Sequence, residues 1–179
     1  MNRKQLIEQL TQYMTFNQTE EGMRIRMLDF VEQYEDCFER SLLIGHITAS
    51  CWVINENRDK VLLIDHVKLK KWLQPGGHCD GDQNTLRVAL KELHEETGIV
   101  PSISMPQIFD VDIHMIPERK GIPEHEHFDL RYLFVAHDKQ VIVQNHETHA
   151  IRWVNLAELE LVTNEESILR MKSKTKATQ

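Results

Sequence analysis

The N-terminal part of the chain is predicted to form two amphipathic helices. Apolar side chains recur at helical spacing at Leu6, Ile7 and Leu10, and a second apolar stripe follows Asn17. Glu20 stands three positions after Asn17, which is the spacing of a capping box at the start of a helix. Two arrangements are open for the two helices. They pack on the rest of the chain, which the pattern favours, or they form a surface for a homodimer.

Beyond these helices the hydrophobic period changes from helical to alternating. Strands are predicted at residues 45–53, 61–64, 109–115, 128–135, 141–143 and 150–154. A helix is predicted over residues 84–96, and a closing helix begins between Thr163 and Glu166 and runs to about Lys172. The Pro- and Gly-containing segment 116–126 is predicted to be a loop between strands.

These elements predict an α/β (α+β) fold, with a mixed sheet flanked by helices in a single main domain. No internal repeat and no Pro/Gly/Ser-rich linker divides the chain. We expect a helical extension over residues 1–42, a main domain over residues 43–172 and a flexible tail over residues 173–179.

The composition excludes several classes of protein. The 179 residues, 41% of them hydrophobic, can bury a core without disulfides or a structural metal. The mean hydropathy of -0.44 and the lack of an apolar run of about 18 residues argue against a transmembrane helix. The first residues lack an apolar signal region, so we expect a cytoplasmic protein. Cys37, Cys51 and Cys79 are odd in number and lack CxxC spacing, which argues against a disulfide framework and a zinc ribbon.

The charge of the chain constrains its partners. With 28 acidic and 21 basic residues, the net charge of -7 opposes binding to polymeric nucleic acid or to an anionic membrane. A small phosphorylated substrate is still compatible with this charge if a metal ion screens its phosphates.

The helix predicted over residues 84–96 carries an unusual acidic face. Glu92 is a helical neighbour of both Glu95 and Glu96, on the side opposite the apolar stripe. Like charges at this spacing destabilise a helix by about 0.2–0.5 kcal/mol each, and the macrodipole disfavours anions near the helix C-terminus. A solvated acidic face is the common explanation of such a pattern. A bound divalent cation is the other, because hard oxygen ligands from consecutive turns suit Mg²⁺ or Mn²⁺.

The spacing around these glutamates decides between the two explanations. The segment GHCDGDQNTLRVALKELHEETGI, residues 77–99, resembles the Nudix box, and chance agreement over the whole chain is roughly 10⁻⁵. The matching residues are Gly77, Glu92, Leu93, Glu95, Glu96, Gly98 and Ile99. The resemblance implies a Nudix-like α/β/α sandwich. It also implies metal-dependent hydrolysis of a diphosphate linkage, in a nucleoside diphosphate derivative or a similar organic pyrophosphate, with Mg²⁺ or Mn²⁺ as cofactor.

The resemblance also assigns roles to residues. Gly77, through its backbone carbonyl, and Glu92, Glu95 and Glu96 are expected to hold the metal, with Glu92 and Glu95 also serving in catalysis. We expect Pro75, Gly76 and Gly77 to form a turn, in which glycine tolerates a positive φ and lets backbone carbonyls approach the metal closely. Family members take the general base either from the box or from a later loop.

The later-loop candidate for the base is Glu147, six positions before Trp153. The alternative for Glu147 is an ordinary turn carboxylate, and the sequence favours neither role over the other.

Two box positions depart from the family pattern. Gln83 stands where the family has Glu, and Lys91 stands where it has Arg. Glutamine keeps an acceptor oxygen without the charge, and lysine lacks the planar fork that can hold two carboxylate oxygens. These departures support a second hypothesis, a catalytically silent Nudix-like domain that binds a nucleotide or acts in regulation. The three retained glutamates favour the enzyme.

Two further residues are candidates for substrate binding. Arg131, in a predicted strand, is suited to a substrate phosphate, although the sequence favours a surface ion pair for it. Trp72 is suited to stacking on a base, although the sequence favours packing beside Leu73.

Pairs of histidines at metal-ligand spacing occur in two places, at His125 and His127 and at His146 and His149. Ten histidines in a strand-rich chain produce such pairs readily, so the sequence does not favour a zinc site.

Overall fold

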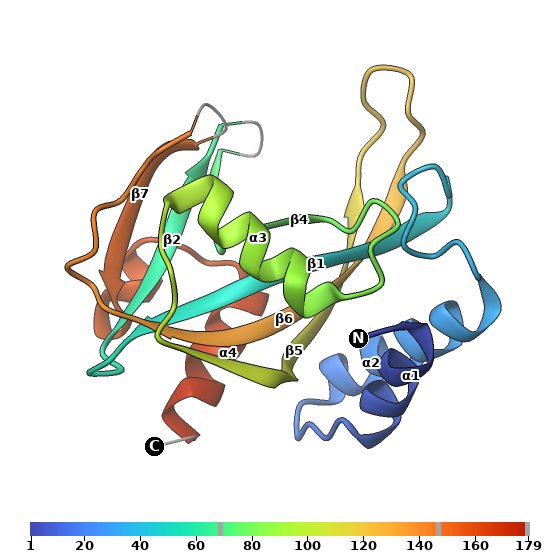
Figure 1. The fold of residues 1–179 in the computed structure, drawn as a ribbon, viewed down its shortest axis with the longest axis horizontal. Coiled ribbons are helices and arrows are strands. Elements are labelled where there is room, and N and C mark those ends of the chain that lie inside the picture. Colours follow the sequence, from blue (N-terminus) through green and yellow to red (C-terminus); the bar gives the residue numbers. More distant parts are fainter. Residues whose placement is uncertain (68–69, 146–147, 178–179) are drawn as a thin grey trace. The chain divides into compact units, whose positions relative to one another are not determined.

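The computed structural model describes residues 1–67, 70–145 and 148–177 (Figure 1). The helices are α1 (Arg3–Gln12), α2 (Gln18–Gln33), α3 (Thr85–Thr97) and α4 (Glu166–Ala177), with a 3₁₀ segment η1 (Leu156–Leu161). The strands are β1 (Gly45–Asn55), β2 (Lys60–His66), β3 (Lys71–Leu73), β4 (Gly76–His78), β5 (Ile103–Ile116), β6 (His125–Ala136) and β7 (Thr148–Asn155).

The strands form a seven-stranded sheet in a mixed α+β fold. The strand order is β3-β2-β1-β6-β5, with β4 paired to β1 and β7 paired to β2. Two compact units divide the chain, and each is described by itself. Unit 1 comprises Met1–Ser50, Gly76–Ala89 and Pro106–Tyr132, and unit 2 comprises Cys51–Pro75, Leu90–Met105 and Leu133–Gln179.

In unit 1, the predicted N-terminal helices α1 and α2 are present and lie side by side. Phe30 of α2 stacks on Phe128 of β6, with ring centroids 4.0 Å apart. Asn17 caps α2 as predicted, because its side chain accepts a hydrogen bond from the backbone of Glu20. The carboxylate of Glu20 does not complete the capping box. It is buried and accepts hydrogen bonds from Tyr13 and from the backbone of Val111 on β5, so it ties the helices to the sheet.

Strand β1 is buried along its whole length, although the sequence predicts alternation between a buried and an exposed face. The difference follows from its position, because β1 lies between β2 and β6 and carries polar side chains that find partners inside the protein. Thr48 and Ser50, both in unit 1, donate hydrogen bonds to Asp129 of β6 at 3.0 and 2.7 Å.

In unit 2, β2 and β7 pair in antiparallel register from Lys60 opposite Asn155 to His66 opposite Thr148. The closing helix α4 continues to Ala177, beyond the predicted end near Lys172. Buried Thr175 explains this extension, because its hydroxyl accepts a hydrogen bond from the indole of Trp52 at 2.8 Å. The expected flexible tail is therefore helical through Ala177.

The strand predictions differ from the structure in length, at one segment that forms no strand, and at β3 and β4, which the sequence did not predict. Strands β5 and β6 extend beyond their predicted ends, and the loop over residues 116–126 is correspondingly shorter. Residues 141–143 form no strand, because the amide of Val143 donates to the carbonyl of Thr97 at the end of α3. None of the helices in the described part of the chain combines the length and the apolar composition that crossing a bilayer requires.

Candidate active site

The first turn of α3 is fixed by polar side chains of unit 1. The side-chain oxygen of Asn84 accepts a hydrogen bond from the backbone of Arg87 at 3.3 Å, which is the N-cap interaction. The guanidinium of Arg87 donates to both carboxylate oxygens of Asp82, at 2.9 and 2.7 Å. The hydrogen bond from Arg87 lowers the pKa of Asp82. The helix therefore begins at the position that the sequence predicts.

The last turn of α3 is fixed within unit 2 by Gly98. Its φ of +71° is in the left-handed region, and its amide donates to the carbonyl of His94 at 2.9 Å. A Cβ atom at this position would lie 2.9 Å from the side chain of Val143. Both the backbone conformation and the close contact therefore require glycine here.

The three candidate metal ligands differ in exposure along this last turn. The side chain of Glu92 is 18% exposed and that of Glu95 is 54% exposed, whereas Glu96 is buried. The ammonium nitrogen of Lys91 lies 3.0 Å from a carboxylate oxygen of Glu95 and 3.5 Å from one of Glu92. The hydrogen bond to Glu95 raises the pKa of Lys91. One lysine thus bridges two of the three carboxylates.

These residues suit a hard divalent cation. The donors are all carboxylate oxygens on one and a half turns of a helix, and Mg²⁺ and Mn²⁺ favour such ligands together with water and substrate phosphate. The donor set therefore fits the expected metal.

Gly76 and Gly77 lie in a strand and not in the expected turn with positive φ. Strand β4 pairs with β1, with Gly77 opposite Ala49 and Gly76 opposite Ser50. A Cβ on Gly76 would lie 2.8 Å from the Cα of Ser50. Glycine is required at position 76 because two strands approach closely, and neither Gly76 nor Gly77 has a positive φ.

Arg131 is in the interior of unit 1, and its guanidinium is held by three carboxylates. It donates to Asp129 at 2.8 Å, to Asp112 at 3.1 Å and to Asp110 at 3.3 Å, and its side chain is 3% exposed. Burial lowers the pKa of Arg131, but attraction to the three aspartates outweighs burial and raises the pKa above its ordinary value. The structure thus places this predicted phosphate ligand in a buried ion-pair network.

Trp72 lies on β3 in unit 2 and has one covered face. The guanidinium carbon of Arg152 lies 4.3 Å from the centroid of the Trp72 ring, in a cation–π contact. Stacking of a base on that face would require displacement of Arg152.

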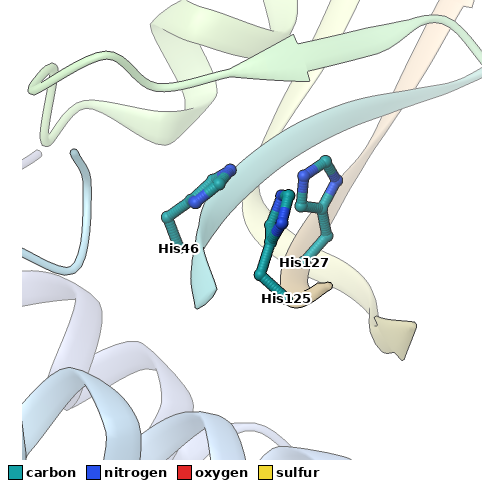
Figure 2. A group of neighbouring side chains, drawn as sticks. All are labelled: His46, His125 and His127. Carbon is teal, nitrogen blue, oxygen red and sulfur yellow. The ribbon is translucent and has the colours of Figure 1, made fainter. Parts of the chain in front are cut away.

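A group of histidines gathers in unit 1 that the sequence analysis does not bring together. His125 and His127 of β6 lie beside His46 of β1, and the ligand nitrogens of the three rings are all within 4.8 Å of one another (Figure 2). The contribution of His46 was missed because it depends on the pairing of distant strands. In the sequence, His46 is only one of several polar residues that alternate with apolar ones in the predicted strand.

The comparison with protein families accounts for the architecture and the acidic helix. The model of the NUDIX domain matches residues 45–172, which is more than half of the chain. The chain belongs to the Nudix hydrolase family.

Relatives of this Nudix hydrolase carry names that describe phosphate chemistry. A probable DHNTP pyrophosphohydrolase of Lactococcus lactis is 30% identical over 137 residues, which cover 75% of this chain and 80% of the relative. Phosphatase NudJ of Escherichia coli is 32% identical over 124 residues, which cover 66% of this chain and 74% of the relative.

Solved structures show the same fold at low sequence identity. A binary complex of the Caenorhabditis elegans Ap4A hydrolase has a TM-score of 0.60 at 17% identity and covers 74% of this chain and 96% of its own. The NUDIX domain of Shewanella oneidensis NrtR, complexed with ADP ribose, has a TM-score of 0.60 at 16% identity and covers 84% of this chain and 96% of its own. These likenesses confirm the predicted fold.

The two departures from the Nudix pattern have different surroundings. In unit 1, the side-chain oxygen of Gln83 accepts a hydrogen bond from the backbone amide of Arg3 at 2.9 Å. Arg3 is the first residue of α1, where backbone amides lack partners within the helix. Gln83 therefore supplies a hydrogen-bond acceptor to the first residue of the N-terminal extension. Lys91 contacts Glu92 and Glu95.

Glu147, the candidate general base, and His146 lie outside the described residues. Next to them, the side-chain amide of Asn145 donates to the backbone carbonyl of Glu95 at 3.4 Å. The segment that leads to Glu147 therefore contacts the last turn of α3.

Proposed function

We propose that this Nudix hydrolase cleaves a phosphoanhydride bond of an organic pyrophosphate in a reaction that depends on Mg²⁺ or Mn²⁺. The observation that carries the proposal is the last turn of α3, where three glutamates stand at the positions of the Nudix box and Lys91 contacts two of them, Glu92 and Glu95. The fixed ends of the helix support it, because Asn84 and Gly98 hold these carboxylates on a rigid element.

Glu92, Glu95 and Glu96 of unit 2 would hold the cation. A bound Mg²⁺ or Mn²⁺ neutralises the phosphate oxygens and lowers the pKa of a coordinated water. The protein supplies the remaining steps. Lys91 keeps two of the carboxylates in place at 3.0 and 3.5 Å, and Glu147 is the candidate that removes the proton from the attacking water.

The substrate class rests on the names of the relatives. A pyrophosphohydrolase and an Ap4A hydrolase act on compounds that contain adjacent phosphates, and the NUDIX domain of NrtR holds ADP ribose. We infer that a nucleotide-like pyrophosphate is the substrate.

A hydrolysis assay tests the proposal directly. The purified chain is incubated with Mg²⁺ or Mn²⁺ and a panel of nucleoside triphosphates, dihydroneopterin triphosphate, ADP-ribose, nucleotide sugars and dinucleoside polyphosphates, and released phosphate is measured after a coupling phosphatase. Glu95→Gln and Glu96→Gln are expected to reduce turnover by several orders of magnitude while the chain stays folded. Glu8→Gln is the matched control, because Glu8 is an exposed glutamate on helix α1, and it is expected to match the wild type.

The assay also separates the enzyme from a silent domain. Turnover that survives in Glu95→Gln would contradict the ligand assignment. Binding of a nucleotide without turnover of any compound in the panel would favour the catalytically silent Nudix-like domain.

A further inference from the structure

Strand geometry brings three histidines together at one end of the sheet in unit 1. His125 and His127 are two residues apart on β6, so their side chains point to the same face. His46 belongs to the neighbouring strand β1, and Figure 2 shows the three rings gathered beside one another. Their ring centroids are 4.8–5.3 Å apart.

Several ring nitrogens in this cluster have no hydrogen-bond partner. His46 is 2% exposed, and neither of its nitrogens makes a hydrogen bond of good geometry, although the nearby backbone of Leu42 favours its charged form. Nε2 of His127 is likewise buried and without a partner. A buried polar atom without a partner costs about 1–3 kcal/mol, so a group of them in one place points to a missing partner.

A metal ion is one partner of this kind, because it accepts a lone pair from a ring nitrogen. Nδ1 of His125 lies 2.8 Å from the carbonyl of Pro123, so Nδ1 carries the proton and Nε2 presents a lone pair. Backbone contacts of this type orient histidine ligands in metal sites.

We propose that His46, His125 and His127 form a binding site for a transition metal ion of the Zn²⁺ type, with ligands other than the carboxylates of α3. Imidazole nitrogens select Zn²⁺, Co²⁺, Ni²⁺ or Cu²⁺ over Mg²⁺. Three protein ligands leave a fourth position for water or an exogenous ligand. Zn–N bonds of about 2.0–2.1 Å at tetrahedral angles place nitrogens roughly 3.4 Å apart. The rings therefore rotate inward on binding from their separations of up to 4.8 Å.

Access to the site comes through the less buried ligands. His125 and His127 are half-buried, whereas His46 is buried. Two further histidines lie next to the cluster. The ring centroid of His127 is 5.0 Å from that of His78 and 5.5 Å from that of His114.

Metal titration of the full chain tests the site. Chelator-treated protein is titrated with Co²⁺ while visible absorption is recorded, and with Zn²⁺ in competition with a chromophoric chelator. We expect one equivalent of Co²⁺ with the absorption of a tetrahedral nitrogen-ligated ion, which Zn²⁺ displaces. His125→Ala is expected to weaken Zn²⁺ binding by at least about 100-fold, since even loss of a group that only orients a ligand costs 10–100-fold. His127→Ala is expected to do the same.

Two further variants make the result specific. His149→Ala removes an exposed strand histidine outside the cluster and is expected to bind Zn²⁺ like the wild type. Glu95→Gln impairs the carboxylate site and is expected to keep the Co²⁺ spectrum. Failure of the histidine site can therefore be distinguished from failure of the proposed hydrolysis. Circular dichroism verifies folding of each variant. Absence of Co²⁺ and Zn²⁺ binding at micromolar concentrations, or unchanged affinity in folded His125→Ala, would overturn the proposal.

Discussion

Replacing Arg131 with methionine is predicted to destabilise the protein by about 3–5 kcal/mol. The guanidinium donates to Asp110, Asp112 and Asp129 at 2.8–3.3 Å, and all four side chains are buried or nearly so. Removing one partner from a buried ion-pair network leaves the remaining charges without compensation, which costs about 3–5 kcal/mol. For a chain of this length, 1 kcal/mol shifts Tm by roughly 2–4 °C, so Tm is expected to fall by about 6–20 °C.

A double-mutant cycle shows whether charge is the cause. Asp110→Asn alone removes a carboxylate that accepts from Arg131 at 3.3 Å and is expected to destabilise the chain. In the double variant with Arg131→Met, the same change removes one of the charges that the first substitution left behind. The combined loss is therefore expected to be smaller than the sum of the single losses by about 0.5–3 kcal/mol.

Urea unfolding followed by tryptophan fluorescence measures each free energy of unfolding. Arg152→Met is the control, because Arg152 is exposed and its contact with Trp72 is worth only about 0.5–1 kcal/mol. A loss below 1 kcal/mol in Arg131→Met would refute the reasoning, as would strict additivity with Asp110→Asn. A rise in KM at unchanged stability would instead restore Arg131 as a phosphate ligand.

Two substitutions and one labelling experiment test other parts of the structure. Lys91→Arg restores the planar fork beside Glu95 and is expected to raise kcat/KM by about 2- to 10-fold in the phosphate-release assay; a decrease would contradict a role in holding the carboxylates. Gly98→Ala is expected to cost about 1–2 kcal/mol in urea unfolding, because φ is +71° and the new Cβ meets Val143; an unchanged midpoint would contradict this. Burial raises the pKa of Cys37 to about 12. At pH 8, below that pKa, its thiolate is roughly 1,000-fold scarcer than at an ordinary pKa, so Ellman's reagent should label it only after unfolding, and rapid labelling of the folded chain would contradict the burial.

Features that depend on neighbouring positions in the sequence were predictable. The N-cap at Asn17 and the glycine that ends α3 at Gly98 act within one helical turn, and the sequence placed both correctly. The grouping of the glutamates on α3 was also predictable, because helical spacing alone makes Glu92 a neighbour of Glu95 and Glu96. These are the features on which membership of the family rests.

Features that depend on pairing between distant segments were not predictable. Glu20 has the spacing of a capping box, yet its carboxylate is used by Tyr13 and by the backbone of Val111. Gly76 was interpreted as a turn residue, but the reason for glycine is the approach of β1 at Ser50. In both cases the sequence pattern correctly singled out the residue, but the group that it contacts belongs to a distant part of the chain.

The same distinction decides which polar residues are candidates for ligands. A polar side chain in an apolar context indicates a ligand only if the fold does not supply its partners. The fold supplies them for Arg131, whose nitrogens donate to three aspartates, and for Gln83, whose oxygen accepts from α1. It does not supply them for His46, whose two ring nitrogens are buried without hydrogen bonds beside His125 and His127. We therefore expect ligand binding in this part of the sheet at the histidines, which the sequence did not favour, and not at Arg131, for which the sequence favoured an ion pair.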